Sequence, residues 1–117
     1  MTDELDIHRA TESERIDAYR NVHEVWGGAL SIDAHVSRRI ASVQHNRALW
    51  CVGCLNGLVV TSLGCCPIQF RVHEKSHLGI AIGAVHTVAE FRGRGFAPQL
   101  IEWVERDQQQ QGVALSL

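Results

Sequence analysis

Long apolar runs, a strong excess of one charge and a signal peptide are all missing from this sequence. Because no stretch of about 18 apolar residues occurs, we expect no membrane-spanning helix, and the acidic, polar start is unlike a secretory signal. The formal net charge is only -2, so neither nucleic acid nor an anionic membrane is expected as a partner. No internal repeat or linker is visible. We therefore expect one cytoplasmic domain over residues 1–117.

Four cysteines are present, and Cys51-Val-Gly-Cys54 followed by Cys65-Cys66 resembles a zinc ribbon. Both pairs fall in segments that read as strands. Along a strand, successive side chains point to opposite faces, so residues that are adjacent or three apart do not converge on one tetrahedral ion. We expect buried, reduced thiols that pack as small apolar groups, with no disulfide and no metal.

The first half of the chain predicts one strand and two helices. Alternating polarity over Leu5–Arg9 favours a strand, and Thr11 with Glu14 forms a capping box that begins a helix. Gly27-Gly28 ends that helix, and Asp33 is expected to cap the next one. The predicted buried stripes are Ile16, Tyr19, His23 and Trp26 on the first helix, and Val36, Ile40 and Val43 on the second.

The second half predicts a hairpin, a further strand, a helix and a last strand. Residues 48–55 and 58–66 pair across Asn56-Gly57, and alternation over 68–72 favours an extension of the second strand. After a turn at 75–77, a central strand is expected over 78–88, a helix over 95–110 that Gly112 terminates, and a strand over 113–117. The order β-α-α-β-β-β-α-β indicates an α/β (α+β) fold with a mixed sheet.

The most informative segment is Arg92-Gly93-Arg94-Gly95-Phe96-Ala97, between the central strand and the following helix. A helix start offers free N–H groups and the positive end of the dipole, which suits a phosphate. A dinucleotide fingerprint fits less well, because Pro98 stands where its third glycine belongs. No G-K-[ST] follows, so a P-loop is not expected. An ordinary strand-to-helix turn is the other interpretation.

This segment fits the Q/R-x-x-G-x-G/A signature of the GNAT superfamily of acetyl-CoA-dependent N-acetyltransferases, and 82–87 resembles that family's central strand. The resemblance is good over 78–117 and looser before it. It implies a GNAT-like sheet, acetyl-CoA as co-substrate, a pyrophosphate on the N–H groups of 93–97, and pantetheine along 86–88. The residues that it assigns to acetyl-CoA are His86, Thr87, Val88, Arg92, Gly93, Arg94, Gly95, Phe96 and Ala97, with Arg92 and Arg94 as charge partners and the Val88 N–H polarising the thioester carbonyl.

The resemblance also implies direct attack of a primary amine, which has to be deprotonated. Many family members use a glutamate on the central strand, but 78–88 contains no carboxylate here. His86 is the one titratable residue in that strand, and the ordinary pKa of a histidine side chain suits a general base. The alternative is a histidine that only packs on one face of the sheet. Glu90, in the following turn, could reach the site, or be solvated, or pair with Arg92 or Arg94.

The family continues for a further helix and two strands, often with a tyrosine that protonates the departing coenzyme A. Tyr19, the only tyrosine, does not match that position. The chain therefore looks truncated, and an exposed last strand could pair with a second copy. The predicted function is N-acetyl transfer to a small-molecule or peptide amine. A non-catalytic acyl-CoA-binding module and an interaction domain that pairs through its last strand are the alternatives.

Overall fold

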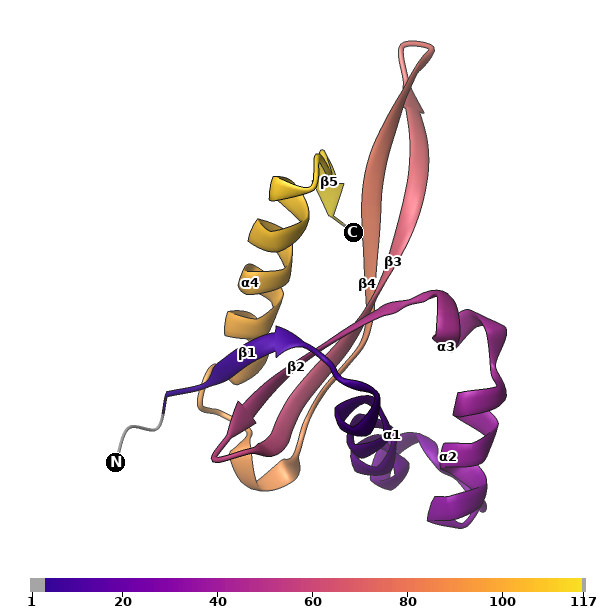
Figure 1. Cartoon of the computed structure of the whole chain (residues 1–117), viewed down its shortest axis with the longest axis vertical. Helices are drawn as coiled ribbons and strands as arrows, with labels where there is room; N and C mark the ends of the chain where they lie inside the picture. The colour runs from indigo at the N-terminus through magenta and orange to yellow at the C-terminus, as the bar shows by residue number, and fades with distance from the viewer. Residues whose placement is uncertain (1–3, 117) are drawn as a thin grey trace.

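The computed structural model describes residues 4–116 as a five-stranded sheet with helices on both faces (Figure 1). The strands lie in the order β1-β2-β3-β4-β5; the first four are antiparallel, and β5 runs parallel to β4. No helix in this part of the chain is long and apolar enough to cross a membrane. The elements are β1 (Asp6–Arg9), α1 (Glu12–Trp26), α2 (Ile32–Ala41), α3 (Val43–Arg47), β2 (Leu49–Leu55), β3 (Leu58–Val72), β4 (Lys75–Thr87), the 3-10 turn η1 (Ala89–Phe91), α4 (Phe96–Gln110) and β5 (Leu115–Ser116).

The predicted element order and the mixed sheet are confirmed, and the short helix α3 is an addition that the sequence analysis missed. The prediction of one helix through Val43 is wrong, because Ser42 ends α2 in extended backbone and its side chain accepts a hydrogen bond from the N–H of His45, which begins α3. The predicted cap of α2 is also wrong. Ser31 caps it through the N–H of Ala34, while Asp33 lies inside the first turn.

The capping box of α1 is confirmed: the Glu14 N–H donates to Thr11 Oγ1 at 3.2 Å, and the Thr11 N–H donates to Glu14 Oε1 at 2.9 Å. The buried stripes are only partly as predicted. Tyr19 and Val36 are buried, but Trp26 is 45% exposed and Val43 is 64% exposed. On α1 the buried side chains are Ala18, Tyr19 and Val22, so the helix turns a different edge toward the sheet than the predicted stripe.

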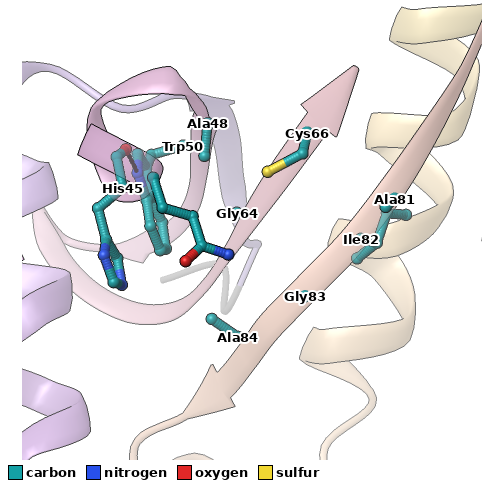
Figure 2. Close-up of a pocket in the computed structure, with 10 residues that line it drawn as sticks. His45, Ala48, Trp50, Gly64, Cys66, Ala81, Ile82, Gly83 and Ala84 are labelled. Atoms are coloured by element: carbon teal, nitrogen blue, oxygen red, sulfur yellow. Dashed lines mark hydrogen bonds between the residues drawn. The ribbon is translucent and has the colours of Figure 1, made fainter. Parts of the chain in front are cut away.

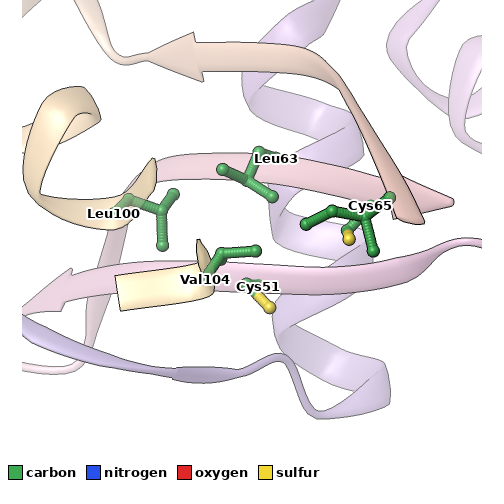
Figure 3. Close-up of a cluster of buried hydrophobic side chains, with 6 residues drawn as sticks. Cys51, Leu63, Cys65, Leu100 and Val104 are labelled. Carbon is green, nitrogen blue, oxygen red and sulfur yellow. The ribbon is translucent and has the colours of Figure 1, made fainter. Parts of the chain in front are cut away.

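Two apolar layers hold the fold together, one on each face of the sheet. On one face α4 packs against β2, β3 and β4 through a fully buried cluster (Figure 3): Cys51, Leu63, Cys65, Ile80, Leu100 and Val104. On the other face α1 and α2 cover Val52, Val59 and Trp50 with Ala18, Tyr19 and Val36. The site described below lies where β4 leaves this sandwich.

The cysteines lie as the strand alternation predicts: Cys51 packs under α4, whereas Cys54 packs under α1 on the opposite face. Burial raises the pKa of the Cys51 and Cys54 thiols to about 12, so both stay protonated at neutral pH. Cys65 is buried as well, but Cys66 is only half-buried, which corrects the expectation of four buried thiols. All four are free thiols.

β3 and β4 form a long hairpin whose distal half projects beyond the rest of the sheet (Figure 1). The extension of β3 to Val72 is confirmed. The turn lies at His73–Glu74, both with positive φ, and not at 75–77, which belong to β4. The tight turn at Asn56-Gly57 is confirmed; both residues have positive φ, as a two-residue hairpin requires.

β5 pairs with β4 only at Gly79 and Ile80. Its predicted last residue, Leu117, lies outside the described part of the chain, and pairing with a second copy stays a prediction. The cap at Gly112 is confirmed: φ is 90°, and the N–H groups of Gly112 and Val113 donate to the carbonyls of Gln109 and Gln108. Within residues 4–116 no strand covers the outer edge of β4 beyond Ile80, so the backbone there is open to a ligand.

Acidification from about pH 7 to pH 5 is expected to destabilise the fold in part through His35. His35 is buried in α2 beside the His23 ring, and burial, aided by the charge of Arg39, lowers its pKa from 6.5. The unfolded chain therefore binds a proton near pH 6.5 that the folded chain resists, so stability falls as the pH drops through that value. Urea unfolding at both pH values should show a smaller loss in His35→Leu.

Two comparisons sharpen that measurement. His73 is exposed at the tip of the β3–β4 turn, and His73→Asn, which tolerates the positive φ, should keep the full pH dependence. His8 acts in the opposite direction, because its contact with Glu14 raises its pKa; the difference between His35→Leu and the parent isolates His35 from this effect. An identical pH dependence in His35→Leu and the parent contradicts the prediction.

Candidate functional site

The segment between β4 and α4 forms a backbone cradle. Gly93 and Gly95 adopt φ of 81° and 77°, which favours glycine, and Gly95 stands at the N-cap of α4 with no side-chain hydrogen bond. Side chains cap α1, α2 and α3, by contrast. The first-turn N–H groups of Phe96 and Ala97 have no intrahelical acceptor. They form a positive terminus suited to an anion.

A cavity of about 280 Å³ lies at this cradle. The end of β4, the glycine turn and the first turn of α4 line it: Val85, His86, Thr87, Phe91, Arg92, Gly93, Gly95, Phe96, Ala97 and Pro98. Most residues predicted to hold acetyl-CoA are therefore brought together around one hollow. Val88, Glu90 and Arg94 are not among its lining residues; Glu90 is exposed on η1, and the Arg94 guanidinium lies over the Phe91 ring at 5.3 Å.

A second cavity of about 290 Å³ lies further back along β4 (Figure 2). The parallel rings of His45 and Trp50, with centroids 5.8 Å apart, form one wall. Its remaining lining residues are Gln44, Ala48, Gly64, Cys66, Ala81, Ile82, Gly83 and Ala84. Different parts of β4 line the two cavities. Residues 81–84 line the second cavity, and residues 85–87 line the cradle.

A bulge in β4 lies between the residues that line the two cavities. Ser62 lies opposite His86 and Gly64 opposite Gly83. β4 therefore contains one residue more than β3 between these two pairs, which is a β-bulge. Ala84 takes φ of 53° there, a conformation that costs an alanine on the order of 1 kcal/mol. Local strain is thus concentrated between the two cavities.

His86 lies on the face of β4 that α1 covers, and it is 6% exposed. Its Nε2 is 3.2 Å from Glu24 Oε1 at the end of α1. Because a carboxylate only accepts, Nε2 carries the proton and Nδ1 keeps its lone pair. Burial, helped by the charge of Arg92, lowers the pKa of His86, while Glu24 opposes this effect. The ring is therefore neutral at pH 7 and has one basic nitrogen.

The family follows from a comparison of sequences. Residues 6–117 match the sequence model of the acetyltransferase (GNAT) domain. The chain is a member of the GNAT acetyltransferase family. No curated protein matches this GNAT chain.

Solved structures agree with this GNAT chain in fold. A GNAT family acetyltransferase from Staphylococcus aureus is 15% identical with a TM-score of 0.76, over 96% of this chain and 83% of that one. The aminoglycoside N-acetyltransferase AAC(6')-Iy, solved with CoA, is 19% identical with a TM-score of 0.72, over 99% and 76%. Glucosamine-6-phosphate N-acetyltransferase from Arabidopsis thaliana is 14% identical with a TM-score of 0.66, over 97% and 80%.

Glu24 is the residue of this GNAT site that the sequence analysis missed. Its Oε1 accepts from Arg92 Nη2 at 3.1 Å and contacts His86, so it joins α1 to the end of β4. No local pattern distinguishes it from the other acids of α1, because its contacts depend on how the helix packs. Arg92 also donates from Nε to the Thr87 carbonyl at 2.9 Å. Its guanidinium thus braces the cradle, and Arg92 as a charge partner of the phosphate stays a prediction.

The Val88 N–H is expected to polarise the thioester carbonyl, but in the structure of this GNAT chain it is not free. That N–H donates to the Val60 carbonyl at 2.8 Å, so it is already used in pairing with β3. Antiparallel ladders alternate, and the neighbouring residue therefore turns its N–H and C=O to the other edge. The contact of the Thr87 carbonyl with Arg92 shows this orientation, which leaves the Thr87 N–H at the open edge of β4.

Proposed function

We propose that this chain transfers the acetyl group of acetyl-CoA to a primary amine by direct attack on the thioester. The observation that carries the proposal is the uncapped start of α4 beside Gly93 and Gly95, at the open edge of β4. The pyrophosphate would accept from the N–H groups of Phe96 and Ala97. Arg94 supports it, because within the described residues it has no carboxylate partner and is available to a phosphate.

The pantetheine arm would then extend along the outer edge of β4 over Val85–Thr87, as an added strand does. The thioester carbonyl would accept from the Thr87 N–H, which takes the place of the Val88 N–H in the expected mechanism. A fixed backbone donor in a site without bulk water stabilises the oxygen as it gains negative charge.

The acceptor amine would enter through the second cavity, next to the bulge at Ala84. Its nitrogen lone pair attacks the thioester carbon, the C–S bond breaks, and coenzyme A leaves as the thiolate. The amine loses its proton to Nδ1 of His86, the nitrogen with a free lone pair. Glu24 acts as a positioning residue that keeps the proton on Nε2. The acceptor, small molecule or peptide, fits a hollow walled by Trp50 and His45.

Calorimetric titration of the purified chain with acetyl-CoA, coenzyme A and ADP tests the donor site first. Binding in the micromolar range, about -8 kcal/mol, is expected for acetyl-CoA and coenzyme A. A panel of primary amines, followed by release of free thiol, then tests transfer. Binding without turnover of any amine would favour the non-catalytic acyl-CoA-binding module. Absence of binding by the folded chain contradicts the cradle assignment.

A further inference from the structure

Three groups capable of binding metal meet where β1, the first turn of α1 and β2 come together. His8 Nε2 lies 2.7 Å from Glu14 Oε2, and Cys54 Sγ lies 3.5 Å from the same oxygen. The three donor atoms all lie within 4.8 Å of one another. They come from three different elements and are joined by tertiary packing alone, since Cys54 is 40 residues from Glu14 in the sequence.

The capping box does not account for this convergence. It uses Oε1 of Glu14, which accepts from the Thr11 N–H at 2.9 Å. The other oxygen, Oε2, faces His8 and Cys54. One carboxylate therefore has two separate tasks, and Oε2 can bind a cation while Oε1 still caps α1.

Asp6 supplies an independent feature of a metal-binding histidine. Its Oδ1 lies 3.4 Å from Nδ1 of His8, on the side of the ring away from Glu14. A carboxylate that accepts from one ring nitrogen fixes the histidine tautomer and makes the other nitrogen a better ligand. Without an ion, Nε2 of His8 donates a proton to Glu14 Oε2. A bound ion displaces that proton, Asp6 holds the other proton on Nδ1, and the Nε2 lone pair then faces the ion.

We propose that His8, Glu14 and Cys54 bind one Zn²⁺ ion in a site that pins β1 and α1 to β2. Thiolate, imidazole and carboxylate form a ligand set that zinc accepts, whereas Mg²⁺ and Ca²⁺ prefer oxygen ligands alone. Zinc bonds of about 2.0 to 2.3 Å place neighbouring ligands roughly 3.3 to 3.6 Å apart. The Cys54–Glu14 spacing already fits, and the His8–Glu14 spacing needs to open slightly. Binding releases the thiol proton of Cys54.

The site is separate from the acetyl-transfer machinery. Glu14 and Glu24 both belong to α1, and a separation of ten positions along the helix amounts to about 15 Å. His8 is partly exposed, with a side chain 35% accessible, so an ion has a route in and a water can complete the tetrahedron. The ion is expected to stabilise the fold and to leave the affinity for acetyl-CoA unchanged.

Titration of the chelator-treated, reduced chain with Co²⁺, a coloured substitute for Zn²⁺, tests the proposal. A thiolate-to-cobalt charge-transfer band is expected to grow to one equivalent and to vanish when Zn²⁺ is added. Cys54→Ser should abolish the band. Cys66→Ser is the matched control, because Cys66 is a free thiol outside the cluster, and it should keep the band at full intensity.

Two conservative variants test the site independently, in case Cys54→Ser does not fold. Glu14→Gln keeps an acceptor oxygen for the capping box but removes the anionic ligand, and Asp6→Asn replaces the anionic acceptor of the His8 ring with a neutral one. Both should weaken Co²⁺ binding by about tenfold or more, and Zn²⁺ should raise the melting temperature of the parent more than theirs. A chain without a stoichiometric band, or a band that persists in Cys54→Ser or is lost in Cys66→Ser, overturns the proposal.

Discussion

Arg94→Glu is expected to weaken binding of acetyl-CoA about 100-fold, close to 3 kcal/mol. Arg94 follows the first glycine of the cradle, and within the described residues it has no ion pair that would hold it away from a phosphate. Hydrogen bonds to charged groups are worth roughly 1.5 to 3 kcal/mol each, and the new carboxylate adds repulsion. Calorimetric titration with acetyl-CoA and ADP measures the loss, which should appear for both ligands.

Arg71→Glu provides the matched control, because it reverses the same charge at an exposed position of β3 in the projecting hairpin. Its affinity for acetyl-CoA should stay within about twofold of the parent, since exposed charges separated by more than about 10 Å are screened. Equal affinities in Arg94→Glu and the parent would remove Arg94 from the site. An equal loss in both variants would mean that only the overall charge matters.

His86→Gln is expected to lower kcat by about 10² to 10⁴-fold, the usual contribution of a positioned base, with little change in the affinity for acetyl-CoA. In the parent, kcat/KM should fall with acidification through a pKa below 6.5, because burial lowers the pKa of His86. The neutral ring is the active form, so activity is lost as the pH drops. Initial rates of thiol release between about pH 5 and pH 8 measure both effects.

Two variants separate a base from a packed histidine. Glu24→Gln leaves His86 in place but no longer fixes the proton on Nε2, so kcat should fall and the acid limb should move, while acetyl-CoA still binds. His77→Gln changes a histidine of the projecting hairpin, where its ring stacks on Phe70, and should keep both kcat and the pH profile. A His86→Gln enzyme with the parent's kcat would return His86 to a purely structural role.

Local signals in the sequence predicted local structure well. The capping box at Thr11, the tight turn at Asn56-Gly57 and the cap at Gly112 all rest on contacts between near neighbours in the chain. The glycines of the cradle were found for the same reason. The end of α2 was predicted wrongly. Ser42 both stops α2 and caps α3, but the apolar spacing of Val36, Ile40 and Val43 is that of one continuous helix.

Roles that depend on tertiary packing could not be predicted. Glu24 becomes a partner of His86 only because α1 ends above β4. The Val88 N–H is unavailable to a ligand because of the register between β3 and β4, which no single strand encodes. The cluster of His8, Glu14 and Cys54 escaped the sequence analysis because cysteine spacing finds ligands within one segment, and these come from three.

The extra residue of β4 determines which face receives the proposed base. Ile80 and Ile82 pack toward α4, and after the bulge Val85 does so too, so the inward positions change from even to odd numbers at Ala84. In a regular strand His86 would keep the parity of Ile82 and point into the layer beneath α4, away from Glu24. The bulge therefore reverses which face of the sheet each later side chain of β4 points to. A mutation that straightened it would bury an imidazole in the apolar core and present Val85 to the amine.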